Sequence, residues 1–318
     1  MKHPLANQLT LLALLGRWKS LNLDPQVREI LLNSWAEGSK AQYLSYLRRW
    51  ATFCSENNID QTKTSLEMGT KFLYKLYREQ LGYSAIKTAV SALSSVLSPI
   101  DEKPFGKHPL IVRFLKGVFR KRPSLPKYVV TYDPDRILNY LRKLPSYKEI
   151  GLKDLTLKMK TLLSLSSGQR CQTLKVLFIE HMKFTRENVV LYIPEVIKNT
   201  TPNFHAKPII LPRFKNKHVC PVRAIQEYLL TTAGKRKSKS LIVSYFNFSA
   251  VTAQTIAKYI KGTLLNAGID TTVFGAHSTR HASASKAVMN KVPVEKILKA
   301  GGWKNDSSFK KHYKLDII

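Results

Sequence analysis

The sequence predicts a mainly helical protein with a small β-sheet, divided into an all-helical N-terminal part and a mixed α+β C-terminal part. Residues 24–122 carry apolar side chains at the three- and four-residue spacing of amphipathic helices. Residues 188–193 and 207–211 alternate instead and are rich in β-branched side chains, as strands are. The segment 120–128 between the two parts is basic and contains two prolines, so it predicts an inter-domain linker.

Four amphipathic helices are predicted in an N-terminal domain at residues 25–119. The clearest of them, from Ser39 to Glu56, places Leu44, Leu47 and Trp50 on one face. The other three are expected at 65–80, 84–97 and 109–120. With no strand pattern between them, these helices predict an all-helical domain of about 100 residues.

The C-terminal domain, at residues 129–318, is expected to mix helices with strands. Its two alternating segments flank a polar turn and predict a hairpin-like pair of strands. Leu241–Tyr245 is expected to form a further strand. Helices are expected at 133–144, 151–166, 221–233, 252–267, 278–290, 293–300 and 306–315.

The charge of the chain predicts a polyanionic partner. Its 318 residues include 52 Lys and Arg against 21 Asp and Glu, a formal net charge of +31 spread over both parts. Such an excess is costly through self-repulsion, so double-stranded DNA is the leading partner and an acidic membrane surface the second. The predicted DNA contacts are Lys87, Arg113, Arg120, Lys121, Arg122 and Lys127. The basic run 235–239 fits a nuclear localisation signal, a phosphate contact or a solvated loop.

Cysteine usage and hydropathy exclude other classes. Cys54, Cys171 and Cys220 are scattered and show no CxxC spacing, which argues against a disulfide scaffold and a zinc ribbon and fits a reducing compartment. No apolar run approaches the roughly 18 residues that a membrane span needs. Basic residues follow the apolar stretch Leu9–Leu15, so residues 1–24 are predicted to be an N-terminal arm or short helix and not a signal peptide.

Missing motifs narrow the chemistry. The chain has no GxxxxGK[ST] loop, no carboxylate cluster at metal spacing and no HxE…PCxxC signature. These gaps argue against a nucleotide triphosphatase, a two-metal nuclease and a zinc deaminase. Phosphoryl transfer without a metal or cofactor remains, and it needs a protein nucleophile, cations on the phosphate oxygens and a proton donor for the leaving oxygen.

An ordered series of residues in the C-terminal domain can supply those groups. The series comprises Arg170 after an apolar helix, Lys198 in a polar turn, the His277-x-x-Arg280 motif, Trp303 and Tyr313. In this order the residues resemble the motif series of the tyrosine recombinases, and the resemblance covers roughly residues 25–318. It implies a helical core-binding domain followed by a catalytic domain of the tyrosine-recombinase fold.

Local motifs resemble one subgroup of that family. The segments 167–174 and 276–280, together with His108-Pro109 and Arg122-Pro123, look like the enzymes of Crypton and DIRS-type eukaryotic mobile elements. This resemblance implies a DNA recombinase or transposase that moves a mobile element and works in the nucleus. It also implies a homo-oligomer, with a dimer on each DNA site and a tetramer in synapsis.

The resemblance implies a role for each residue of the series. Tyr313 would attack the scissile phosphate to give a 3′-phosphotyrosine, while Arg170 and Arg280 clamp the phosphate with their guanidinium groups. His277 would exchange a proton with Tyr313, and Lys198 would protonate the leaving 5′-oxygen. Trp303 would hold the position that is His in many members and would donate its indole N–H to the phosphate.

Structural roles compete with these functional ones. Tyr313 lies four residues from Phe309 and could serve core packing, as could Trp303. His277 could be a helix cap and Lys198 a solvated loop residue, with Lys207 as an alternative acid.

Two features depart from the family pattern. Thr173 stands where many relatives have an acidic residue that braces the site, so another group must do so. Only five residues follow Tyr313, whereas many relatives pass a longer C-terminal helix to a neighbouring subunit.

Three readings therefore stay open for the function. The first is an active recombinase that closes on DNA as a C-shaped clamp. The second is a domesticated, catalytically silent DNA-binding protein, and the third is a type IB topoisomerase-like enzyme that shares the tyrosine and cation chemistry. The presence of the whole series favours the first over the second.

Overall fold

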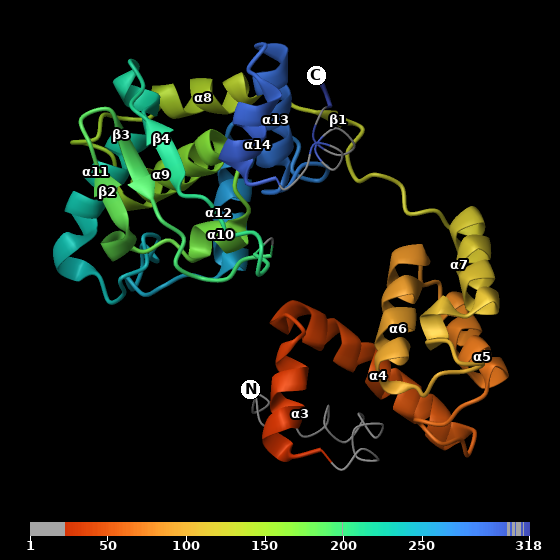
Figure 1. Cartoon of the computed structure of the whole chain (residues 1–318). Coiled ribbons are helices and arrows are strands. Elements are labelled where there is room, and N and C mark those ends of the chain that lie inside the picture. Colours follow the sequence, from red (N-terminus) through yellow and green to blue (C-terminus); the bar gives the residue numbers. More distant parts are fainter. Residues whose placement is uncertain (1–22, 199, 304–305, 307–308, 310–312, 314) are drawn as a thin grey trace. The chain divides into compact units, whose positions relative to one another are not determined.

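The computed structural model describes residues 23–198, 200–303, 306, 309, 313 and 315–318. The chain divides into two compact units, residues 1–125 and 126–318, which we call the helical unit and the catalytic unit (Figure 1). The predicted arm at 1–24 lies almost wholly outside the described residues. In the part of the chain that is described, no helix is both long and apolar enough to cross a membrane.

The helical unit consists of α-helices joined by short connections. They are α3 (Pro25–Asn33), α4 (Glu37–Glu56), α5 (Leu66–Arg78), α6 (Tyr83–Val96) and α7 (Pro109–Lys121). Local capping sets several starts, because side-chain oxygens of Asp24 and Ser65 accept backbone N–H bonds at the beginnings of α3 and α5. The four predicted helices correspond to α4, α5, α6 and α7, and each forms within two residues of its expected bounds.

Aromatic packing fills the core of the helical unit. The Trp50 ring packs edge-on against Phe72, with ring centroids 5.1 Å apart, and its indole Nε1 donates to the Gln61 carbonyl at 2.9 Å. Phe105 sits so close to Gly69 that an added Cβ would lie 2.5 Å from its ring. The short 3₁₀ turn Phe105–Lys107 thus closes over α5 through a glycine-sized gap.

The end of the helical unit corrects the expected linker start. Helix α7 runs on to Lys121, so the first two residues of the predicted 120–128 linker are helical. The side chain of Arg122 then turns back: its Nη1 donates to the Tyr77 carbonyl at 2.7 Å, and its guanidinium lies 3.8 Å from the Tyr77 ring centroid. Arg122 thereby adds a side-chain donor to a carbonyl in the last turn of α5 that already accepts the Gln80 N–H.

The catalytic unit mixes helices with short strands. Its helices are α8 (Pro134–Lys143), α9 (Leu152–Ser167), α10 (Cys171–Lys175), α11 (Pro221–Thr232), α12 (Ala253–Asn266), α13 (Ser278–Met289) and α14 (Val294–Gly301). Six of them match predicted helices closely, whereas the single turn of α10 was not expected. The predicted helix 306–315 falls largely on residues outside the described set, and Asp306, Phe309 and Tyr313 within it are helical.

Three antiparallel strands form the main sheet, in the order β2 (Met182–Phe184), β3 (Asn188–Leu191) and β4 (Ile209–Pro212). The two predicted strands do pair, with Val189 opposite Leu211, but the long segment 192–208 joins them where a hairpin turn was expected. Strand β2 was not predicted.

The expected strand at Leu241–Tyr245 is wrong. Its surroundings contain only isolated bridges, Ser240 with Phe178 and Val243 with Ala250. Ile242 and Val243 are nevertheless buried. Their side chains pack in the core although no continuous strand pairs with this segment among the described residues.

A second, smaller sheet holds the C-terminus. Strand β5 (Asp316–Ile317) pairs in parallel with β1 (Val130–Thr131), with Val130 opposite Asp316. The Ile318 N–H donates to the Thr131 carbonyl at 2.8 Å. The last residues of the chain are thus fixed to the strand that opens the catalytic unit.

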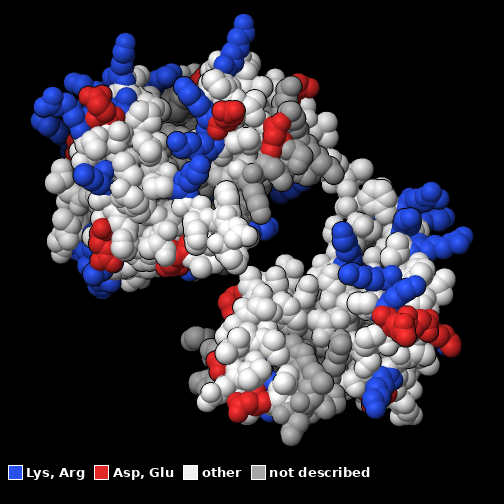
Figure 2. All heavy atoms as spheres, in the orientation of Figure 1, with Lys and Arg blue, Asp and Glu red and all other residues white. Residues whose placement is uncertain are grey.

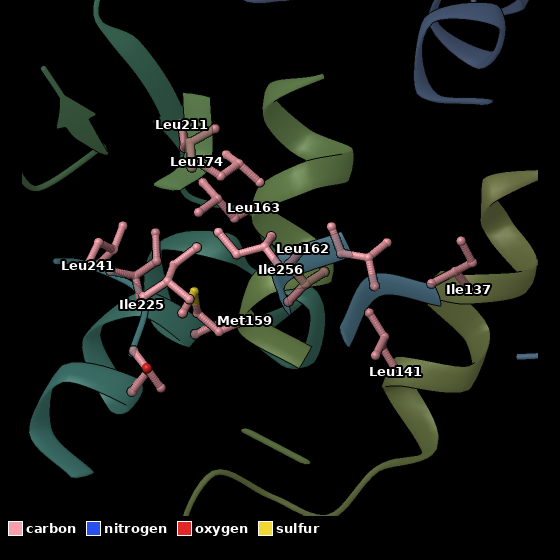
Figure 3. Packing of buried hydrophobic residues seen from close by; sticks show 14 of the residues in the cluster. Ile137, Leu141, Met159, Leu162, Leu163, Leu174, Leu211, Ile225, Leu241 and Ile256 are labelled. Atoms are coloured by element: carbon pink, nitrogen blue, oxygen red, sulfur yellow. The ribbon is translucent and has the colours of Figure 1, made fainter. Parts of the chain in front are cut away.

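Helix α9 is the central element of the catalytic core. It packs against α11, α12 and α13, and Met159, Leu162 and Leu163 on it are fully buried. Figure 3 shows these side chains among Ile225, Leu241 and Ile256 from surrounding elements. Burial on every side makes α9 a rigid base, and the C-terminal end of this base leads directly to Arg170.

Candidate active site

The first residues of the series sit at the sharp turn after α9. Gly168 ends the helix in the left-handed conformation, with φ of 58°, a geometry that glycine adopts without strain. Arg170 then occupies the N-cap position of α10, where its backbone carbonyl accepts the Leu174 N–H and its side chain makes no capping bond. The neighbouring Gln169 is buried, and its amide nitrogen donates to the Ala300 carbonyl at 2.9 Å. The turn is therefore tied to the end of α14, far along the chain.

Helix α13 brings His277 and Arg280 to the same place. Ser164 on α9 and Thr279 on α13 are both buried, and their hydroxyl oxygens lie 2.9 Å apart. This contact fixes α13 against the last turn of α9. The HxxR motif of α13 therefore faces the turn that carries Arg170.

The Arg280 guanidinium is held by backbone carbonyls. Its Nη1 donates to the Gly301 carbonyl at 2.6 Å and also to the Gly168 carbonyl. The side chain is 1% exposed, and its Nε and Nη2 have no hydrogen-bond partner among the described residues. Burial, followed by the charge of Arg170, lowers the pKa of Arg280 to about 10, so the group stays cationic at neutral pH.

These carbonyls provide the bracing that the missing acidic residue would supply. Thr173 is buried within α10 and brings no negative charge to the site. The two carbonyl dipoles face the cation instead, and an arginine buried this deeply needs such partners. Nε and Nη2 of Arg280, which carry three N–H groups, have no partner among the described residues and can bind an anion.

Trp303 and Tyr313 enclose the other sides of Arg280. The Trp303 ring lies 3.6 Å from the guanidinium carbon and packs edge-on against Tyr313, with centroids 4.9 Å apart. The Tyr313 ring centroid is 5.1 Å from the guanidinium. The indole Nε1 of Trp303 is buried and has no hydrogen-bond partner among the described residues. Packing and N–H donation are thus both open to Trp303.

His277 lies next to the tyrosine and among the cations. The Tyr313 hydroxyl is 3.4 Å from Nε2 of His277. Burial is the largest cause that lowers the pKa of His277, to about 4, and Arg280, Arg170, Lys198 and Lys127 add repulsion. The imidazole is therefore neutral at pH 7 and has a nitrogen free to accept a proton.

Lys198, in the segment 192–208, is exposed, and its charge is one of those that lower the pKa of His277. Lys207 lines a cavity of about 280 Å³ that borders the site, since Trp303 and Gln169 line it too. Of the two lysines considered from the sequence, only Lys198 is among the charges that act on His277.

The structure also reveals site neighbours that the sequence argument missed. The His281 ring stacks on Tyr313 with centroids 4.5 Å apart and an interplanar angle of 23°. Ser285 donates through Oγ to the Tyr313 carbonyl at 3.1 Å. Lys127, predicted to contact DNA, also acts on His277. The position of His281 directly after Arg280 is the one signal in the sequence that could have pointed to it.

The predicted DNA contacts lie at the surface except for one. Lys87, Arg113, Arg120, Lys121 and Lys127 are exposed, whereas Arg122 is half-buried on Tyr77. Figure 2 shows Lys and Arg side chains on the visible faces of both units, with fewer acidic ones between them. Contact of these residues with DNA remains a prediction.

His277 and Arg280 lie beside Tyr313, and the charges of Arg170 and Lys198 act on His277, so the tyrosine lies in a cationic centre that suits an anionic ligand. A comparison with protein families matches residues 134–316 to the phage integrase family. The match covers more than half of the chain, so the chain belongs to this family, the tyrosine recombinases. No match was found among curated protein sequences.

Solved structures share the fold. The XerH site-specific recombinase bound to difH substrate in a pre-cleavage complex superposes with a TM-score of 0.62 and 15% identity, over 86% of this chain and 76% of that one. The Tn1549 transposon integrase in complex with transposon right end DNA gives a TM-score of 0.58 and 14% identity, over 88% and 90%. A lambda integrase dimer bound to a COC′ core site gives 0.53 and 13%, over 94% and 96%. The chain thus has the tyrosine-recombinase fold, mainly helical with a small sheet.

Proposed function

We propose that this protein is a site-specific DNA recombinase that cleaves and rejoins DNA through Tyr313. The observation that carries the proposal is the position of the Tyr313 phenol, 3.4 Å from a neutral His277 and beside the Arg280 guanidinium. A nucleophile, an adjacent base and a cationic phosphate site within hydrogen-bonding reach of one another are the parts that covalent phosphoryl transfer needs.

In the proposed reaction the Tyr313 oxygen attacks the scissile phosphorus while its proton passes to Nε2 of His277. The bond from phosphorus to the 5′-oxygen breaks, and Lys198 gives that oxygen a proton. The products are a 3′-phosphotyrosine and a free 5′-hydroxyl. Arg170 and the unpaired Nε and Nη2 groups of Arg280 stabilise the charge on the non-bridging oxygens. Rejoining runs the same steps backward with another strand's 5′-hydroxyl.

The assembly and setting are part of the proposal. The structural neighbours include a lambda integrase dimer on a core site and a lambda integrase tetramer on a Holliday junction, which supports a dimer per DNA site and a tetramer in synapsis. The motifs at 167–174 and 276–280 support a Crypton or DIRS-type mobile element in a nucleus as the setting. The basic run 235–239 fits import into that compartment.

Trapping of a covalent adduct tests the proposal. The full chain is incubated with random-sequence duplexes that each carry a nick, so that cleavage near the nick releases a short 5′-hydroxyl fragment by diffusion. Wild-type protein should leave DNA attached to protein in a denaturing gel, and sequencing of that DNA gives the site. Tyr313→Phe keeps the ring and should bind the recovered site equally well without forming an adduct.

Other outcomes of this assay favour other functions. Binding without any adduct would identify a silent DNA-binding protein, and an adduct with Tyr313→Phe would move the nucleophile to another tyrosine such as Tyr245 or Tyr259. Relaxation of supercoiled plasmid that lacks the recovered site, without recombination of a plasmid that carries two copies, would identify a topoisomerase.

A further inference from the structure

We infer that Ser285 is a positioning residue for strand cleavage: its hydroxyl holds the backbone directly after the nucleophile, at the Tyr313 carbonyl and the Leu315 N–H, and so sets the approach of the Tyr313 oxygen. The inference rests on the proposed function. It assigns a role in catalysis to a residue outside the ordered motif series.

Two hydrogen bonds carry the inference. The Ser285 Oγ donates to the Tyr313 carbonyl at 3.1 Å and accepts from the Leu315 N–H at 3.0 Å. Ser285 is 4% exposed, so the hydroxyl exchanges both bonds with protein and not with water. A single small side chain thus bonds both the carbonyl of Tyr313 and the N–H of Leu315, two residues later.

The position of Ser285 on α13 gives these bonds a functional consequence. Arg280, which holds the phosphate, lies five residues earlier on α13, and His277 immediately precedes the helix. The two bonds of Ser285, which we call the serine clamp, therefore link the backbone of Tyr313 to α13. The same helix positions Arg280 for the phosphate and His277 for the proton. A displacement of about 1 Å between reacting groups is enough to cost about 10²-fold in rate.

The rest of the C-terminal segment is anchored independently. The β1–β5 ladder and the bond from Ile318 N–H to the Thr131 carbonyl hold residues 316–318. Loss of the serine hydroxyl should consequently leave the segment attached and the fold intact. What it should lose is the fixed direction of the Tyr313 side chain.

Ser285→Ala tests the role directly on the trapped-adduct substrate. We expect adduct formation to slow by about 10²-fold, with DNA affinity within twofold of wild type. Ser285→Thr retains a hydroxyl and should recover most of the rate. Ser283→Ala is the matched control, because Ser283 lies on the same helix and its hydroxyl donates to the Thr279 carbonyl one turn earlier, with no bond to the C-terminal segment among the described residues.

An external nucleophile separates positioning from general damage to the site. In a Tyr313→Phe background, hydrogen peroxide can attack the scissile phosphate in place of the tyrosine. Ser285→Ala added to this background should leave peroxide cleavage unchanged, because phosphate activation by Arg170 and Arg280 is intact. Equal loss of peroxide cleavage would show that Ser285 supports the whole site and would overturn the positioning role.

Failure of this inference is distinguishable from failure of the proposed function. If wild type forms an adduct and Ser285→Ala forms it at the same rate, the serine clamp has no role and the recombinase assignment stands. If wild type forms no adduct on any DNA, the proposed function fails and the role of Ser285 fails with it.

Discussion

The two units differ most in what their interiors contain. Among the described residues of the helical unit, His108 is the one buried polar or charged side chain, and it caps α7 through its ring nitrogen. The catalytic unit buries Lys158, Lys160 and Arg280, together with a series of hydroxyl groups. A buried ionisable group costs free energy that an apolar side chain would not, either as a charge or because it must give up its proton.

This contrast shows where function has shaped the fold. The helical unit follows the ordinary rule of an apolar interior, so amphipathic spacing predicts it well. Arg280 breaks that rule at a place where carbonyls, aromatic rings and free N–H donors converge, and an anionic ligand would offset its cost. The buried lysines, Lys158 and Lys160, lie in the middle of α9, before the end that leads to Arg170. Neither Nζ has a hydrogen-bond partner among the described residues.

The largest expected effect concerns the two kinds of cation at the centre. Lys198→Ala should slow cleavage by about 10² to 10⁴-fold, because the 5′-oxygen then departs without a proton. A substrate with sulfur at this bridging position has a better leaving group and should restore the rate. Arg170→Ala should slow cleavage on both substrates, since its role is charge stabilisation.

Lys207→Ala is the control for the lysine assignment. It should cleave the ordinary substrate at close to the wild-type rate. If sulfur rescues Lys207→Ala and not Lys198→Ala, the acid is Lys207. If sulfur rescues neither, His277 is the next candidate donor.

Two glycines show how differently the two units should respond to an added methyl group. In the catalytic unit, a Cβ on Gly301 would lie 1.7 Å from the Trp303 ring, so Gly301→Ala should lower the free energy of unfolding by about 3 kcal/mol. In the helical unit, Gly117 faces open space within α7, so Gly117→Ala should raise it by about 0.5–1 kcal/mol. Chemical denaturation of both variants measures the difference. Equal changes in the free energy of unfolding would mean that Gly301, whose carbonyl accepts from Arg280, can be replaced by a larger residue without cost.

Replacement of a buried lysine should stabilise the catalytic unit. Burial lowers the pKa of Lys160 to about 6, and its Nζ lies 3.7 Å from the Tyr259 ring centroid. The unfolded chain binds a proton at pH 7 that the native state does not, so native stability falls as pH drops from about 10 toward 6. Lys160→Met should therefore raise the free energy of unfolding by about 2 kcal/mol at pH 7.

The pH dependence of that gain is the sharper measurement. It should shrink toward pH 10, where the unfolded lysine also loses its proton, and level off below pH 6. Lys153→Met changes an exposed lysine of the same helix and should have little effect at any pH. A destabilised Lys160→Met would show that the buried amine contributes to packing more than it costs.

The smallest expected effect is on the titration of His277. Its pKa is near 4 partly because Arg170 repels the imidazolium form. Arg170→Gln removes one of four cations and should move this pKa upward, toward the ordinary value, with burial still holding it low. An NMR titration of the imidazole measures the change. Lys183→Gln changes an exposed lysine on β2 and should leave the pKa of His277 unchanged. An unchanged pKa in Arg170→Gln would show that Arg170 lies away from the site.

The sequence by itself determined most of the helices, two strands of the main sheet and the order of the motif residues. Helical spacing and capping residues act within one or two turns, so α4, α6 and α9 could be predicted from neighbouring residues alone. The charge excess and the series from Arg170 to Tyr313 likewise stand in the sequence without any fold. Their order suggested one site. In the fold His277, Arg280, Trp303 and Tyr313 form one cluster, and the charges of Arg170 and Lys198 act on His277.

Tertiary structure decided what holds those residues in place. Burial of Ile242 and Val243 without a partner strand could not be predicted, because strand formation depends on a neighbour as well as on propensity. The carbonyls of Gly168 and Gly301 meet at Arg280 across more than 100 residues of chain, and every residue has such a carbonyl. Ser285 is one serine among many until the C-terminal segment folds back against α13. Contacts to the backbone leave no trace in residue type, so only the assembled fold reveals them.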